Sequence, residues 1–111
     1  MEDLITITSN FTFKETSGRV VSFIQSKGFK LFGRIDHAEE AKQSGLTLRP
    51  TELIIFGNPK VGTLLMQDKQ TCGIDLPVKM LVWEDESGRT KLSYNRLTSL
   101  QKKHRLSANS K

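Results

Sequence analysis

The sequence predicts a small α+β domain with a mostly antiparallel sheet and helices packed on one face of that sheet. Short β-branched or aromatic runs alternate along the chain with amphipathic segments that begin at capping residues. The stretch 52–83 alone carries two apolar runs with a helix start between them. The chain of 111 residues has the length of one domain, and we expect a core over about 4–106 and a flexible basic tail at 107–111.

The first elements are a strand and a helix. Residues 4–8 alternate and are β-branched, which predicts a strand, with 11–13 as its irregular continuation. Apolar residues at helical spacing then predict a helix over 17–27. Thr16 or Ser17 is the expected N-cap.

A second strand and a short helix follow. Residues 31–37 alternate, so we expect Leu31 and Gly33 on the same side of a strand. Asp36 is followed by a Glu three residues later, which predicts a capped helix over about 38–44.

The centre of the chain holds the clearest pattern. The apolar run 53–56 predicts a strand that stops at Gly57. Asn58 is a good N-cap and Pro59 suits the first helical position, so a helix should run from there to about Asp68.

The next strand begins after Pro77 and covers 78–84. A turn at 85–88 joins it to an alternating strand at 90–95, which predicts a hairpin. Apolar residues over 97–104 indicate a last short helix.

Both central strands, 53–56 and 78–84, are apolar on their two faces, although a one-layer antiparallel sheet in water should alternate. More of this chain, a bound ligand or a second copy could cover the second face. We favour a second copy, and therefore a homodimer.

The charge does not favour a nucleic-acid partner. Seventeen basic and twelve acidic residues give a net charge of +5, but five of the basic residues lie at 96–111 and residues 1–95 are formally neutral. No interleaved aromatics or recognition-helix pattern accompany the basic end.

The apolar runs and the cysteine content of the sequence indicate the cellular compartment. No apolar run approaches the length of a signal or membrane segment, so we expect no membrane partner. Cys72 is the single cysteine, in keeping with a reducing compartment, and we expect a cytoplasmic protein.

Six blocks of the sequence carry a resemblance to a known family. They are Gly33 to Ala38, Leu48 to Leu53, Phe56 to Lys60, Asp75 to Lys79, Trp83 to Asp85, and Ser93 to Asn95. Together they resemble the bacterial and archaeal family of unknown function numbered three hundred and two, over about 16–106.

That resemblance implies an α+β fold similar to the TATA-binding-protein-like architecture, self-association, and no established activity. One departure is visible, because Arg96 and Leu97 stand where the family tends to have Asp-Pro. The change removes an acid and a rigid turn from that corner.

The strand end at Gly57 meets a helix start at Asn58, beside Lys60 and Gly62. Backbone N–H groups, the helix dipole and a cation together suit a small anionic ligand. The spacing is not that of a P-loop, since Thr63 follows Gly62 directly. The plain alternative is a turn that only caps the helix.

Three more residues complete the candidate ligand site. If the chain is extended from Asp75 to Lys79, the two side chains share one side and form an ion pair, or Lys79 contacts the anion. Tyr94, on the following strand, is the third.

The alternative to a binding module is an enzyme. His37 could act as general acid or base, with Lys79 or Tyr94 orienting the substrate. No nucleophile, base and orienting group occur at a recognisable spacing. A third hypothesis is a purely structural homodimer. We expect neither a metal nor a cofactor, because no ligand spacing is present.

Overall fold

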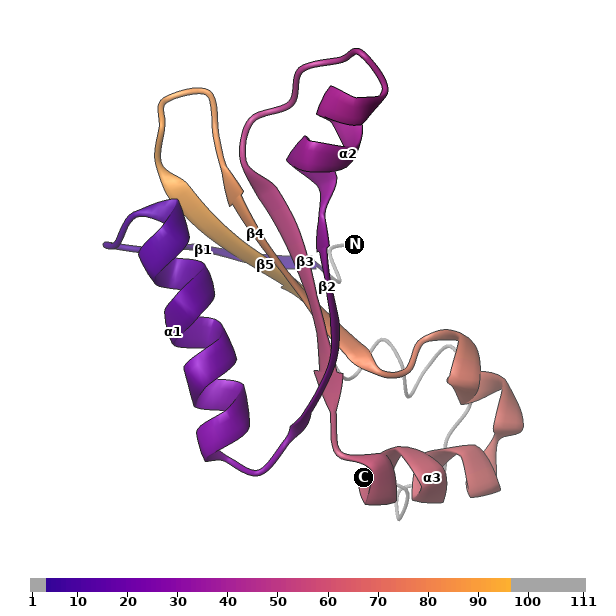
Figure 1. Cartoon of the computed structure of the whole chain (residues 1–111). Helices are drawn as coiled ribbons and strands as arrows, with labels where there is room; N and C mark the ends of the chain where they lie inside the picture. Colours follow the sequence, from indigo (N-terminus) through magenta and orange to yellow (C-terminus); the bar gives the residue numbers. More distant parts are fainter. Residues whose placement is uncertain (1–3, 97–111) are drawn as a thin grey trace.

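The computed structural model describes residues 4–96 (Figure 1). Its elements are β1 (Leu4–Thr8), α1 (Phe13–Ser26), β2 (Lys30–Asp36), α2 (His37–Gln43), β3 (Thr51–Gly57), α3 (Pro59–Asp68), a 3₁₀ helix (Gln70–Ile74), β4 (Val78–Glu84) and β5 (Thr90–Asn95). The five strands form one antiparallel sheet in the order β1-β5-β4-β3-β2. The predicted α+β class and antiparallel sheet are confirmed. The helix expected over 97–104 and the tail at 107–111 lie outside the described residues.

Helix α1 lies against one face of the sheet (Figure 1). The core of that contact is Ile24 of α1 with Ile54 of β3 and Val82 of β4, and none of the three exposes more than 2% of its surface. We call the face of the sheet that packs against α1 the helix-covered face. Strand register places Met80 and Val82 on the helix-covered face, and Leu81 and Trp83 on the opposite face.

The predicted start of α1 is wrong. The helix begins at Phe13, because Thr12 and Glu15 form a capping box in which each side chain bonds the other residue's backbone N–H. Thr16 and Ser17, the expected caps, are instead buried inside the helix. The segment 11–13 is therefore not a strand continuation.

The predicted side-chain alternation in β2 is also wrong at its start. Leu31 pairs with Phe56, but Gly33 pairs with Ile55, so a bulge at Phe32 shifts the register. Leu31 consequently packs on the helix-covered face while Gly33 lies on the other.

The other helix starts agree with the sequence. Asp36 caps α2 by accepting from the Glu39 N–H at 2.9 Å, and Asn58 caps α3, which begins at Pro59. Helix α2 follows the end of β2 and α3 follows the end of β3, so the two lie at opposite ends of the sheet (Figure 1). The 3₁₀ helix after α3 was not predicted.

Candidate functional site

The start of α3 is fully capped from within. Asn58 Oδ1 accepts from the N–H groups of Lys60 at 3.0 Å and Val61 at 3.3 Å, and the Gly62 N–H donates to the Asn58 carbonyl at 2.9 Å. Pro59 has no N–H. An anion at this helix start would therefore compete with the Asn58 side chain for the backbone donors.

Gly57 and Gly62 bring this helix start close to the entry of β4. A Cβ on Gly57 would lie 3.5 Å from the Pro77 Cβ, and one on Gly62 would lie 3.9 Å from Leu76 Cδ1. Both distances are those of ordinary van der Waals contact, so a Cβ at either position would touch the Leu76-Pro77 segment without displacing it.

Lys79 lies on the face of the sheet away from α1, where it pairs with Ile55 of β3. Gly57 is two residues further along β3, on the same face. Its side chain is exposed. Tyr94 pairs with Met80 and so lies on the helix-covered face. The structure brings Lys79, and not Tyr94, to the same face as Gly57.

Asp75 does not occupy an extended segment. It ends the 3₁₀ helix with φ of −104° and ψ of 0°, and β4 begins three residues later at Val78. The four-residue extended spacing that predicted Asp75 and Lys79 on one side is therefore not present.

His37 is the first residue of α2, and it lies at the far end of the sheet from Lys79. The neighbouring Asp36 pairs with Glu52, whereas Lys79 pairs with Ile55. Continuing that register by one residue sets His37 beside Thr51. Thr51 and Ile55 are four residues apart, so about 13 Å of strand separates His37 from Lys79. The residues proposed for an enzyme are not assembled in one cleft.

Cys72 is completely buried. Burial raises the pKa of its thiol, and the charges of Asp68 and Asp75 raise that pKa further. A raised pKa lowers the thiolate fraction, so the surroundings of Cys72 do not activate it as a nucleophile.

The sheet face opposite α1 is largely apolar, and we call it the open face. Its central apolar residues are Ile35, Leu53, Ile55, Leu81 and Trp83. Within residues 4–96, Ser93 is the one fully buried residue on this face, and it accepts a hydrogen bond from Trp83 Nε1 at 2.9 Å. Lys30 and Lys79 lie at one end of the open face.

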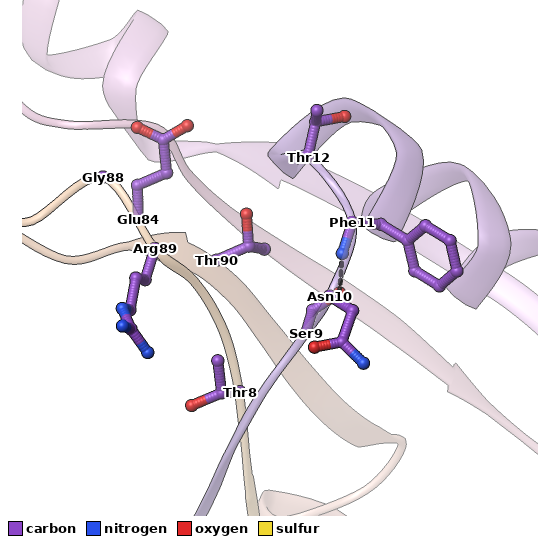
Figure 2. Close-up of a pocket in the computed structure, with 9 residues that line it drawn as sticks. All are labelled: Thr8, Ser9, Asn10, Phe11, Thr12, Glu84, Gly88, Arg89 and Thr90. Carbon is purple, nitrogen blue, oxygen red and sulfur yellow. Dashed lines mark hydrogen bonds between the residues drawn. The ribbon is translucent and has the colours of Figure 1, made fainter.

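A polar pocket lies where the β1–α1 connection meets the β4–β5 hairpin (Figure 2). Its volume is about 420 Å³, and it is lined by Thr8, Ser9, Asn10, Phe11, Thr12, Glu84, Gly88, Arg89 and Thr90. Local sequence patterns do not reveal this site, because its two walls are 72 positions apart at Thr12 and Glu84 and the strand pairing brings them together. The local signal for this site is the polar run Thr8-Ser9-Asn10.

Residues 4–96 contain no group of three or more His, Cys, Asp or Glu side chains arranged to hold a metal ion. Across the same residues, no helix has the length and apolar character needed to cross a membrane.

The fold defines a small α+β domain, and comparison with known proteins identifies its family. Residues 5–111 match the family described as Domain of unknown function DUF302, and the chain belongs to that family. A crystal structure of an uncharacterized conserved DUF302 protein from Bacillus stearothermophilus has the same fold. Its TM-score is 0.84 at 21% sequence identity, over 93% of this chain and 80% of that one.

Curated relatives include three Brucella proteins. The chain is 49% identical over 107 residues, 96% of its length, to proteins named Fluoride-specific ion channel FluC 1 in Brucella suis and Brucella abortus. A protein of Brucella melitensis named Fluoride-specific ion channel FluC 2 has the same identity. The chain spans 40–42% of the length of these relatives.

Proposed function

We propose that this chain is a non-enzymatic accessory domain in fluoride transport, a binding module that works beside a fluoride-specific channel. The supporting observation is the 49% identity to a segment of three proteins that bear the name of such a channel. Two modules joined in one chain are held at high effective concentration, which favours partners that act together.

The fold of the matched segment also occurs as most of a separate protein. The Bacillus stearothermophilus protein has this fold over 80% of its length. We therefore assign the pore to the remaining three fifths of the Brucella proteins and a binding role to the segment that resembles this chain. The proposed compartment is the cytoplasm, in keeping with the free thiol of Cys72.

The partner that we propose for the open face is a second copy of this chain. The apolar centre of that face needs cover, and a symmetric pair covers both copies at once. Lys30 and Lys79 lie at one end of the face, while α2, with the exposed acids Glu39 and Glu40, follows β2 at the other. A two-fold axis that lies in the interface plane, perpendicular to the line joining these two ends, brings the basic end of one copy to the acidic end of its partner.

A test exchanges domains in the Brucella suis relative. We would express three forms in bacteria that lack fluoride channels: the complete protein, the protein with its matching segment deleted, and the protein with that segment replaced by this chain. We expect the deletion to reduce growth in sodium fluoride and the replacement to restore it. An unrelated domain of equal length is the control.

The outcomes separate clearly. Equal fluoride tolerance with and without the segment would remove the accessory role. Rescue by the unrelated domain would show that the segment only fills space.

A second candidate function is binding of a small anion, and the fluoride channels among the relatives favour it. The proposed residues are Asn58, Lys60 and Lys79, at the start of α3 and the adjoining end of the open face. Fluoride is a compact acceptor that suits backbone N–H groups and a lysine ammonium.

The anion hypothesis predicts a saturable effect on backbone amide NMR shifts. Titration with sodium fluoride, with sodium chloride at equal ionic strength as reference, should move Gly57 to Gly62 and Lys79. The pair of substitutions Lys60→Ala and Lys79→Ala should abolish the effect, and Lys42→Ala, which removes an exposed cation on α2, should not. Unchanged affinity in the double variant would place the site elsewhere.

A further inference from the structure

We propose that the pocket between the β1–α1 connection and the β4–β5 hairpin binds the protonated amine of a small molecule, through Glu84 and Thr90. This proposal does not rest on the fluoride role, because the pocket lies at the hairpin end of the sheet and shares no residue with the start of α3.

Two segments form the walls of the pocket. Residues 8–12 form one wall, and Glu84 with 88–90 forms the other (Figure 2). The Ser9 N–H donates to the Thr90 carbonyl at 2.8 Å and ties the walls together at their base. The pocket is therefore built on paired strands and not on a free loop.

Thr90 brings a hydroxyl to the pocket. Only 4% of the surface of this residue is exposed, and Thr90 lines the pocket. Its oxygen is not a buried atom that lacks a partner, since within residues 4–96 that description fits Ser17 Oγ alone, so the Thr90 hydroxyl stays accessible from the pocket. A bound donor can contact the hydroxyl there.

Glu84 supplies a charge beside that hydroxyl. It lies directly opposite Thr90 in register, and the two side chains point to the same side of the hairpin (Figure 2). The carboxylate is half-buried, and it forms neither an ion pair nor a hydrogen bond with a described residue. A partly buried charge without a partner favours a ligand of opposite sign.

The remaining hydroxyls of the lining are already engaged. Thr8 accepts from Lys91 Nζ at 2.8 Å, Ser9 shares a hydrogen bond with Thr16 at 2.7 Å, and Thr12 caps α1 through Glu15. This leaves the Glu84 carboxylate and the Thr90 hydroxyl as adjacent acceptors.

The nearby cations do not take the place of a ligand. Arg49 Nε donates to the Glu84 main-chain carbonyl at 3.2 Å, and Arg89 points to the other side of the hairpin (Figure 2). An ammonium group carries three donors and no acceptor, which matches a carboxylate next to a hydroxyl oxygen. An anion would be repelled by Glu84, and a neutral polyol would leave its charge unpaired.

The test compares two probes that differ in one group. Ethanolamine, as its hydrochloride, and ethylene glycol have equal numbers of heavy atoms, and only the first carries an ammonium. With the ionic strength held constant, we expect ethanolamine to give saturable amide NMR shifts at Ser9, Gly88 and Thr90. Ethylene glycol should give none. Equal saturation by ethylene glycol, or no saturation by ethanolamine, would overturn the proposal.

Matched variants locate the site. Glu84→Gln keeps the shape of the side chain and should weaken ethanolamine binding about tenfold, since a charge-assisted hydrogen bond becomes a neutral one. Glu86→Gln removes the same charge from an exposed position of the turn and should have no effect. Thr90→Val should also weaken binding while Thr90→Ser retains it. If Glu86→Gln weakened ethanolamine binding as much as Glu84→Gln, the effect would be one of overall charge, and the proposed binding site in the pocket would be refuted.

Discussion

At the scale of single residues, two neighbours in α1 show how burial and hydrogen bonding combine. Thr16 and Ser17 expose 3% and 4% of their surfaces. The Thr16 hydroxyl is 2.7 Å from the Ser9 hydroxyl and is hydrogen-bonded to it, whereas Ser17 Oγ has no hydrogen-bond partner among the described residues. Ser17 therefore carries a desolvation cost that Thr16 does not.

We expect Ser17→Ala to stabilise the protein. Removing an unpaired buried hydroxyl recovers about 1 kcal/mol or more of desolvation, and alanine adds about 0.5 kcal/mol of helix propensity. Urea denaturation measures the free energy of unfolding. Ser22→Ala, at an exposed position of the same helix, is the control and should gain only the propensity. Equal gains at the two positions would mean that Ser17 Oγ has a partner in solution.

At the scale of elements, the turn between β4 and β5 depends on one carboxylate. Asp85 Oδ1 accepts from the N–H groups of Arg89 and Ser87, each at 2.9 Å, and Gly88 takes the positive φ of 81° that closes the turn. The hydrogen bond from Arg89 is the largest influence that lowers the pKa of Asp85 below 3.8.

This shift has a definite sign for stability against pH. The pKa of Asp85 is lower in the folded protein than in the unfolded chain. The Asp85 carboxylate therefore stabilises the folded protein at pH values above its unfolded pKa, and this stabilisation is lost as pH falls through its folded pKa. We expect the stability of Asp85→Asn to decrease less than that of the native protein as pH falls below about 4. Chemical denaturation at a series of pH values measures this difference, with Glu86→Gln as control. Parallel curves for the native protein and Asp85→Asn would contradict the role of Asp85.

The same elements show what the sequence could predict. The caps at Asp36 and Asn58 and the hairpin turn were predictable, because each depends on local side-chain chemistry. The start of α1 was not, since Thr12, Thr16 and Ser17 all qualify as caps and tertiary burial decides between them. The bulge at Phe32 was not predictable either, because the sequence of β2 shows no break in the alternation of side chains at that residue.

The candidate sites follow the same rule. The Asn58 cap was predictable, but whether it leaves backbone donors free depends on the rotamer of one side chain. The pocket at Glu84 and Thr90 depends on the pairing of β1 with β5, which joins segments more than eighty positions apart. Long-range register is information that local patterns do not contain.

At the scale of the whole molecule, the sheet has one face packed against α1 and one face without a core of its own in residues 4–96. Strands β2, β3 and β4 have seven residues and are about 23 Å long, and four neighbouring strands span about 19 Å, so a face of this size offers about 440 Å² of flat area per copy. Two such faces bury about 900 Å² in total, which lies below the usual range of specific interfaces. A homodimer formed this way should be weak and dependent on concentration.

A lysine at the centre of the open face should therefore shift the protein to monomer. Leu81→Lys adds a charge that the facing apolar side chains cannot pair, and we expect the dimer to weaken at least about tenfold in sedimentation equilibrium. Ile74→Lys, on the 3₁₀ helix where the side chain is 77% exposed, adds the same charge away from that face and should leave association unchanged. Dimers that survive Leu81→Lys would move the interface to another surface. A native protein that stays monomeric at high concentration would instead leave the open face to a different partner, and the channel segment of the Brucella proteins would be the first to test.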